Sequence, residues 1–576
     1  MIKLYSSLLL WLTVSRLGLA QTNYVANTGN NSSTGAYNTL VGVQAGFNVG
    51  SSGQGNLFSG YQAGYATTSG TNNVYLGLGA AYNNTTGTQN VAVGYQAGVG
   101  SGANNNNNVS IGYQAGVGSG SVSDAVSIGF QAGHTSTGSD NVFIGSQSGK
   151  TNSTGSGNSF VGYTAGQANT TGSGNSFLGT QAGQANTSGT NNSFVGFGAG
   201  AYSTGSYNSF LGYNAGFYTI GAGNSFLGVN AGYFNSTGNN NSFVGSQAGY
   251  YNSAGSNNSF VGTGSGASNK TGSLNSFVGS GAGGSNTSGQ QNTVMGYTAG
   301  YTNVSGNFNV IIGDSAGFKN TVSGNTFIGS KSGYNNTTAT NNTFLGYHAG
   351  YNVTTGNNNI IIGPTSGTAI TDGSDNVLMG YNTQAEDGLH NATAIGSGAR
   401  VAISDALILG NQTKVGIGTS APTAMLHVTS PQTNESGLRL EQLTSNSPAT
   451  RSTDQFLTVN ERGDVVKARY QLRINNASEW SDKVFAPGYR LQSLAEVKKY
   501  IDANQHLPGV PSAEQVVNKG VDLVKMNATL LEKVEELTLY SIQLEKMNQQ
   551  QNEELQSIKR EQAQLKQMLQ QVLNHK

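Results

Sequence analysis

Cysteine is absent from the 576 residues of the chain, and charged side chains make up only 9% of it. Without cysteine, disulfide bonds, thiolate metal sites and a bacterial lipoprotein anchor are excluded. Acidic and basic side chains balance at 26 each, so the net charge is zero. The chain therefore offers no electrostatic attraction for nucleic acid or for an anionic membrane surface, and we expect neither as a partner.

Clusters typical of catalysis or metal binding are also missing. The phrase GSQSGKT at 145–151 is one residue short of a phosphate-binding loop, and its glycines belong to a repeat that runs through the chain. Four acidic residues gather late in the repeats, where we expect a solvated cap: Asp372, Asp375, Glu386 and Asp387. The six histidines are scattered without metal-ligand spacing: His134, His348, His390, His427, His506 and His575. We expect no enzyme activity, no cofactor and no metal.

The N-terminus has the pattern of a secretory signal peptide. A basic start at 1–3 precedes a mostly apolar run at 4–14, and small residues at Gly18 and Ala20 fit a cleavage site after Ala20. The alternative is a membrane anchor, but the run is short for a bilayer and Arg16 follows it. No other long apolar stretch exists, so we expect a secreted or cell-surface protein without a transmembrane segment in its mature form.

One phrase recurs through most of the chain, and NSFVGSQAG at 241–249 is a clear copy. Its first glycine, here called the repeat glycine, occurs 22 times from Gly42 to Gly396 at spacings of 16 to 18 residues. The residue before it is aliphatic in 21 copies, and the residue four before it is asparagine in 20. Such a period predicts stacked units, because a unit of about 17 residues cannot bury a core alone.

Each repeat holds a short run of β-favouring residues between glycine-rich turns. We predict an all-β head, a parallel β-roll or solenoid of about 22 turns over residues 21–410, on the order of 105 Å long at ~4.8 Å per turn. The recurring asparagines can form a hydrogen-bonded ladder. The glycines permit left-handed turns, and a recurring alanine three residues after the repeat glycine suits a crowded corner.

Aromatic residues stand two positions before the repeat glycine in 13 of the 22 copies. Side chains alternate between the two faces of a strand. Because the aliphatic residue before the repeat glycine never gives way to a charge, we predict that it faces inward and that the aromatic residue faces outward. An outward ladder would be a subunit interface or a ligand-binding stripe. Its unbroken part is Phe143, Phe160, Phe177, Phe194, Phe210, Phe226, Phe243, Phe260 and Phe277.

These repeats resemble the heads of trimeric autotransporter adhesins, the YadA-like family. The nearest phrases are NVAVG at 90–94, VSIG at 126–129 and TAIGSGA at 393–399. The resemblance covers about residues 30–410. It implies a left-handed parallel β-roll, a homotrimer on a coiled-coil stalk and a role in adhesion. The repeat here is longer and richer in phenylalanine and asparagine, and we expect no β-barrel anchor of the kind found in that family.

Composition changes near residue 400, because 401–576 hold 19 acidic and 19 basic side chains against 7 and 4 in 21–390. We interpret 411–479 as a connector that resembles tail-fibre proteins, and 480–520 as a small module with a helix over 493–504, similar to one in exported Bacteroidetes proteins. Ser481-Asp482-Lys483 is a fragment of a tail-fibre self-cleavage motif, but the lysine of that motif is missing, so we expect no cleavage.

A heptad pattern predicts a C-terminal coiled coil over 521–574, roughly 75 Å long. The alternative is a solvated single helix. Ten of fifteen inner positions are apolar, and the asparagine and glutamine among the others can fix the register. The apolar core positions are Leu523, Leu530, Val534, Leu537, Leu544, Leu555, Ile558, Leu565, Leu569 and Val572.

The sequence favours an exported, adhesin-like fibre that binds a surface, glycan or matrix ligand through many weak contacts along the rod. Two alternatives remain. A structural or ice-binding solenoid would use regular arrays of asparagine, threonine and serine, although the loop columns vary more than a flat face requires. A phage-tail-like fibre would assemble in the cytosol, which the signal peptide argues against.

Overall fold

The computed structural model of the chain describes residues 24–26, 35–100, 104–118, 120–432, 438, 455–462, 464–469 and 476–574. The predicted signal peptide at 1–20 lies outside them. The chain divides into two compact units, Met1–Thr433 and Asn434–Lys576.

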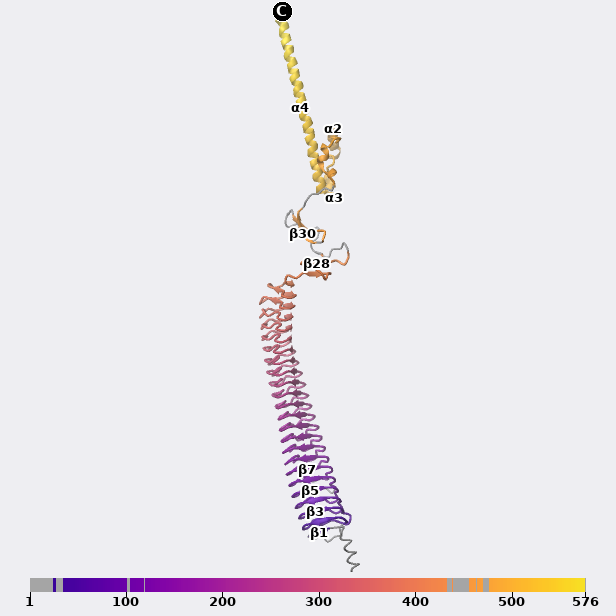
Figure 1. The fold of residues 1–576 in the computed structure, drawn as a ribbon, viewed down its shortest axis with the longest axis vertical. Helices are drawn as coiled ribbons and strands as arrows, with labels where there is room; N and C mark the ends of the chain where they lie inside the picture. The colour runs from indigo at the N-terminus through magenta and orange to yellow at the C-terminus, as the bar shows by residue number, and fades with distance from the viewer. Residues whose placement is uncertain are drawn as a thin grey trace, which may run out of the picture. The chain divides into compact units, whose positions relative to one another are not determined.

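The first unit is dominated by a parallel β-solenoid of about 22 turns over residues 39–409, and Figure 1 shows its strands stacked one above another. Each turn contributes one strand of three residues to a 24-stranded sheet. Neighbouring strands pair in register, so that Phe177 lies opposite Phe194 and Phe194 opposite Phe210. The predicted fold class is therefore confirmed.

The strands of the first unit are β1 Tyr24–Ala26, β2 Thr39–Val41, β3 Leu57–Ser59, β4 Val74–Leu76, β5 Val91–Val93, β6 Val109–Ile111, β7 Val126–Ile128, β8 Val142–Ile144, β9 Ser159–Val161, β10 Ser176–Leu178, β11 Ser193–Val195, β12 Ser209–Leu211, β13 Ser225–Leu227, β14 Ser242–Val244, β15 Ser259–Val261, β16 Ser276–Val278, β17 Thr293–Met295, β18 Val310–Ile312, β19 Thr326–Ile328, β20 Thr343–Leu345, β21 Ile360–Ile362, β22 Val377–Met379, β23 Gln384–Ala385, β24 Thr393–Ile395, β25 Arg400–Val401, β26 Leu407–Leu409, β27 Val415–Ile417 and β28 Leu426–Val428. The pairs β23–β25 and β27–β28 form two separate small sheets.

The faces of the strands are the reverse of the prediction. The middle residue of each repeat strand, two before the repeat glycine, points into the solenoid, and its neighbours point outward. The phenylalanines predicted to form an outward ladder are all at most 1% exposed, namely Phe143, Phe160, Phe177, Phe194, Phe210, Phe226, Phe243, Phe260 and Phe277. The physical reason is that a coil this thin has room for one side chain per strand, and the largest apolar one gains most from burial.

The buried rings stack along the solenoid. Phe194, Phe210 and Phe226 have centroid separations of 4.7 and 4.8 Å and nearly parallel planes. The alanine or serine three residues after the repeat glycine completes the interior, and Ala215 is fully buried in the same core. The predicted crowded corner is therefore confirmed at this position.

The predicted asparagine ladder is confirmed and satisfies both ends of each amide. Asn208 donates from its Nδ2 to the carbonyl of Gly221 at 3.0 Å, and its backbone N–H donates to Oδ1 of Asn192 at 2.9 Å. Its own Oδ1 accepts from the backbone of Asn224 in the next turn at 2.9 Å. Buried amides are stable only when paired in this way, so the column locks each turn to the next.

The described part of the second unit contains a hairpin of two antiparallel strands and, later in the sequence, helices. Its elements are β29 Gln455–Val459, β30 Val465–Arg469, η1 Ala477–Glu479, η2 Ser481–Phe485, α2 Leu494–Asn504, α3 Ala513–Lys519 and α4 Leu523–Leu573. A capping box at Ser493 and Glu496 begins α2, close to the predicted start. The 51 residues of α4 cover the predicted heptad region (Figure 1). Among the described helices, none is long and apolar enough to span a membrane.

Candidate functional site

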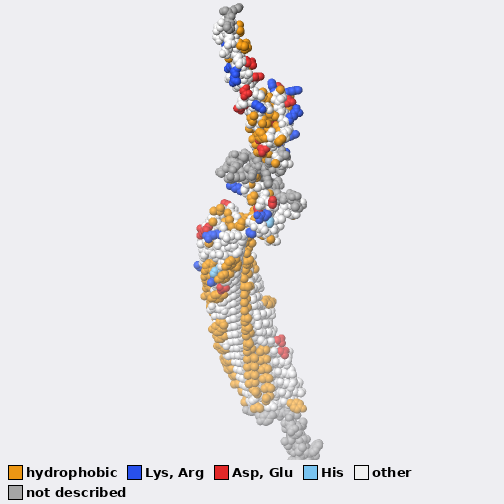
Figure 2. All heavy atoms as spheres, turned by 45° about the horizontal axis from the view of Figure 1, so that its top comes forward, with side chains coloured by type: hydrophobic (Ala, Val, Ile, Leu, Met, Phe, Trp, Pro, Cys, Tyr) orange, Lys and Arg blue, Asp and Glu red, His pale blue; other side chains and the backbone are white. Residues whose placement is uncertain are grey.

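Two kinds of apolar column run along the outside of the solenoid. The first consists of the residues directly before and after the repeat glycines, for example Leu211 and Tyr213, each 50% exposed. Because most turns add a similar pair, these columns make a long apolar stripe, and Figure 2 shows hydrophobic side chains in bands along the solenoid. Isolated exposed apolar residues are ordinary, but a column that is aliphatic in 21 of 22 turns indicates an interaction surface.

The second kind of column lies five residues after the repeat glycine, and we call it the aromatic edge. Aromatic residues fill it in three blocks of consecutive turns, each with parallel stacked rings and centroid separations of 4.9 to 5.6 Å. The blocks are Phe47, Tyr65 and Tyr82; Phe217, Tyr233 and Tyr250; and Tyr301, Phe318, Tyr334 and Tyr351. The sequence shows these aromatic residues at a fixed offset from the repeat glycine. Our prediction of an outward aromatic ladder concerned a different position, two residues before the repeat glycine.

In the middle block the next position is aromatic as well. A second column of Tyr202, Tyr218, Phe234 and Tyr251 stacks at 5.0 to 5.7 Å and is 37–51% exposed. Rings of the two columns meet edge to face, with interplanar angles of 62–86°. We call these seven rings the aromatic patch. It is the largest aromatic group on the outside of the part of the solenoid that the structure describes.

The aromatic patch is electrically neutral. Partial burial raises the pKa of the Tyr233 hydroxyl, and the neighbouring tyrosines, Tyr218 first, raise it further. The pKa of Tyr250 is raised by burial and by Tyr251. Loss of a proton from one phenol becomes harder when others stand close, so the hydroxyls of Tyr233 and Tyr250 stay uncharged well above neutral pH.

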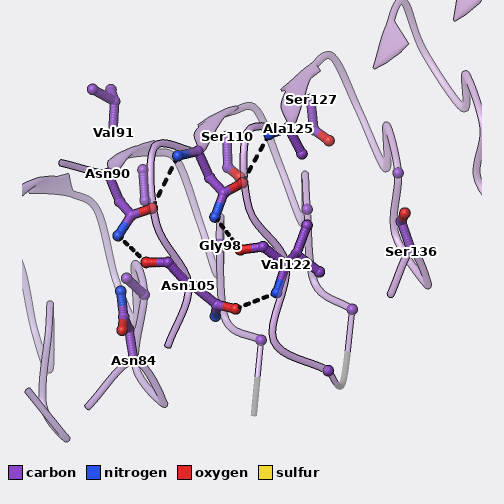
Figure 3. A pocket seen from close by; sticks show the side chains of 18 of the residues that line it. Asn84, Asn90, Val91, Gly98, Asn105, Ser110, Val122, Ala125, Ser127 and Ser136 are labelled. Atoms are coloured by element: carbon purple, nitrogen blue, oxygen red, sulfur yellow. Dashed lines mark hydrogen bonds between the residues drawn. The ribbon is translucent and has the colours of Figure 1, made fainter. Parts of the chain in front are cut away.

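A cavity of about 40 Å³ interrupts the core where the ring ladder fails. Tyr75 and Phe143 line it, and the residues between them at the ring position are Ala92, Ser110 and Ser127. Figure 3 shows the two serines among asparagines whose amides are bonded to neighbouring turns. The space suits a few water molecules and is too small for an organic ligand, so we regard it as a break between two core clusters.

The near match to a phosphate-binding loop has no free backbone amides at its glycines. The N–H of Gly145 donates to the carbonyl of Ile128 at 2.7 Å, and that of Gly149 donates to the carbonyl of Ala165 at 2.9 Å. A phosphate-binding loop needs such N–H groups directed at the ligand. The two glycines therefore serve the solenoid.

The acidic residues near the end of the repeats bond other groups of the solenoid: Asp375 accepts from the Asn358 side chain, Glu386 pairs with Arg400, and Asp387 holds backbone. Asp387 accepts hydrogen bonds from the backbone N–H groups of Thr371 and Asp372 at 2.6 and 3.1 Å. Partial burial alone would raise the pKa of Asp387, but hydrogen bonds from Thr371, Asp372 and Gly388 outweigh it and lower the pKa to about 2. Within the described ranges, no group of three or more histidine, aspartate or glutamate side chains is placed to bind a metal ion.

The fragment of the self-cleavage motif, Ser481-Asp482-Lys483, lies in η2, which packs against α4. Ser481 donates its hydroxyl to Glu535 at 3.1 Å, and Lys483 forms an ion pair with Glu532 at 2.9 Å. This geometry gives no support to autoprocessing.

The predicted coiled-coil positions lie along α4 as exposed side chains. Their exposed fractions run from 46% at Leu530 to 72% at Val572. These values belong to the chain taken alone, so the coiled coil stays a prediction. The helix that it requires is present.

The described part of the chain holds a repetitive solenoid with aromatic columns on its outside, followed in the sequence by a helical module. Comparison with family models, curated proteins and solved structures found no match to the chain. The function must therefore be inferred from the surfaces themselves.

Proposed function

We propose that the chain is an exported, self-associating surface fibre of the adhesin type, whose solenoid binds its ligand through contacts repeated along the rod. The observation that carries this proposal is the regularity of the outer columns, because about 22 turns present similar side chains at a constant spacing. Repeated weak contacts on one rigid body give avidity without a single deep pocket. The resemblance of the repeat phrases to YadA-like heads supports a homotrimer.

The arrangement of the second unit supports self-association through α4. Lys483 reaches Glu532, and the hydroxyls of Ser481 and Tyr489 reach Glu535 and Glu536. At 3.6 residues per turn, these glutamates lie on the side of α4 opposite the heptad positions. The small module thus covers the far side of the helix. Its residues 491–494 border the seam at Leu537 and Leu544, which stay 63% and 57% exposed. A second copy of the same helix is the occupant that fits a heptad seam over 51 residues.

Charges beside the seam favour parallel helices in register. In the heptad register, Glu554 and Glu561 occupy positions that face Lys559 and Lys566 of a parallel neighbour. Opposite charges at these positions select partner orientation more than they add affinity. We therefore propose that all solenoids of one oligomer are joined to the same end of the coiled coil, so that their columns can meet one ligand surface together.

Lysine in place of Leu555, Ile558 and Leu565 together is expected to dissociate the oligomer. Each substitution puts a charge into the seam and removes an apolar side chain that contributes about 1.5–3 kcal/mol when buried. Sedimentation equilibrium of the full chain should show at least a roughly 100-fold rise in the dissociation constant.

The matched control places the same three lysines on the outer side of the same helix segment, at Gln556, Ala563 and Gln567. This variant has the same added charge and should keep the mass of the parent protein. A parent protein that is monomeric at micromolar concentration, or equal masses for the two variants, would refute self-association through this seam.

The same pair of variants tests the adhesive function. On plates coated with collagen, fibronectin or a neutral polysaccharide, the parent protein should be retained on at least one coating. The seam variant should lose about 100-fold or more in retention, because linked sites exceed single ones by factors of about 10² to 10⁴. Retention that is absent on every coating, or that is unchanged in a demonstrated monomer, would argue against a multivalent adhesin.

A further inference from the structure

The aromatic patch lies in the longest uncharged part of the chain. Residues 151–269 contain no aspartate, glutamate, lysine, arginine or histidine. A charged ligand laid on this stretch would lose hydration without gaining a partner of opposite charge. The surface therefore suits an uncharged ligand.

The stacked rings leave part of their faces open. Centroid separations of 5.0 to 5.7 Å within the patch exceed the contact distance of ~3.5–4.0 Å between carbon atoms, so the rings are offset like steps. The last ring of the outer column, Tyr251, is 51% exposed, and the next turn has Ser268 at the equivalent position. No ring of that column covers the face of Tyr251 on that side.

The hydroxyl groups of the patch are also available. Within the described residues, no hydrogen bond engages the hydroxyls of Tyr202, Tyr218, Tyr233, Tyr250 or Tyr251. Each phenol can donate one hydrogen bond and accept others. The patch thus combines apolar ring faces with uncharged donors and acceptors at each turn.

We propose that the aromatic patch binds a neutral polysaccharide laid along the solenoid; this names the ligand class of the adhesive function proposed above and rests on it. Sugar rings present apolar C–H faces that pack on aromatic rings, and hydroxyl groups that pair with phenols and amides. The patch repeats at the ~4.8 Å spacing of the strands, which suits a polymer of similar units better than a single small molecule.

The other two blocks of the aromatic edge extend the same surface. The turn of Phe217 comes eight turns after that of Tyr82, roughly 38 Å along the solenoid, and the turn of Tyr301 comes three turns after that of Tyr250, roughly 14 Å. All three blocks occupy the same offset from the repeat glycine, so they lie along one edge of the solenoid. A long chain that meets the patch can reach them too, which raises avidity without new chemistry.

The test replaces the outer column by serine, as Tyr202→Ser, Tyr218→Ser, Phe234→Ser and Tyr251→Ser in the full chain. Retention is measured on cellulose and chitin as neutral polymers, with alginate and chitosan as charged comparators. We expect retention of the parent protein on at least one neutral polymer, in preference to the charged ones. The quadruple variant should bind at least tenfold more weakly, because buried aromatic contacts dominate such interfaces.

The matched control removes four exposed apolar side chains from the position five before the repeat glycine, which belongs to neither kind of column, as Tyr37→Ser, Tyr207→Ser, Leu274→Ser and Phe308→Ser. Its retention should stay within about threefold of the parent. Tyr251→Ala alone should also weaken retention, since it removes the open ring face at the end of the stack. Circular dichroism melting curves confirm that each variant is folded.

The possible results separate this inference from the adhesive function. Retention on collagen or fibronectin but on neither neutral polymer would overturn the polysaccharide assignment and leave the adhesin standing. Equal losses in the two quadruple variants would overturn the assignment to the patch. A fall in sedimentation mass in the patch variant alone would make the patch a contact between copies of the chain, which also overturns it.

Discussion

Alanine at Gly212 is expected to separate the turns on either side of it. Gly212 has a φ of +146°, a conformation that residues with a Cβ rarely adopt, and an added Cβ would lie 2.3 Å from the carbonyl oxygen of Gly228 in the next turn. The obstacle is backbone, so it cannot rotate away as a side chain would. Strain of this kind costs about 1–3 kcal/mol, and the clash adds to it. We expect a loss of at least about 3 kcal/mol in the free energy of unfolding, measured by urea denaturation.

Gly264 supplies the control. It also has a positive φ, +65°, but an added Cβ would meet nothing within 4 Å. The equivalent position two after the repeat glycine holds Gln247 in the preceding turn at a φ of 58°. Gly264→Ala should therefore cost about 1 kcal/mol or less. If both substitutions cost the same, close approach of neighbouring turns would not be what requires the repeat glycine.

Limited proteolysis locates the damage. In a solenoid each turn contacts only its neighbours, so a broken contact should open the rod locally before the whole array unfolds. We expect new cleavage between the turns of Gly212 and Gly228 in the Gly212→Ala protein. Uniform cleavage along the chain would indicate instead that the solenoid unfolds as one cooperative body.

The period and the strands could be predicted from the sequence because they depend on local chemistry. Asparagine, a β-favouring triplet and glycine recur together, and each has one physical use in a stacked turn. Alternation along a strand then shows which side chains share a face, but it is symmetrical and does not say which face is inside. The serine that begins each strand from Ser159 to Ser276 indicates which face is outside. An interior face would not carry a bare hydroxyl in eight successive turns.

Contacts between distant parts of the second unit could not be predicted in the same way. The helix at α4 follows from a heptad pattern, and its length follows from the pattern as well. The hydrogen bond between Tyr489 and Glu536 joins residues 47 positions apart, so it depends on how the whole module folds back. The aromatic patch could be predicted only in part. Its residues have a fixed offset in the repeat, but its edge-to-face packing depends on the shape of the turn.

Alanine at Phe210 is expected to cost about 3–5 kcal/mol, the usual range for a fully buried phenylalanine. The ring is 1% exposed and lies between Phe194 and Phe226 in the stack. It also fills the space over Gly216, where an added Cβ would lie 2.4 Å from it. The chain itself shows the result of losing rings, because its cavity lies where Ser110 and Ser127 replace them.

Leu211→Ala is the control, since Leu211 is the next residue in the same strand and is 50% exposed on the opposite face. It should cost less than about 1 kcal/mol in the protein's free energy of unfolding. Urea denaturation of both variants at one protein concentration decides between the two orientations of the strand. A larger loss for Leu211→Ala than for Phe210→Ala would place the aliphatic column inside and return the phenylalanines to the surface. A larger loss of stability for Phe210→Ala, which we expect, means that the phenylalanines form the core. Recognition then depends on the aromatic edge.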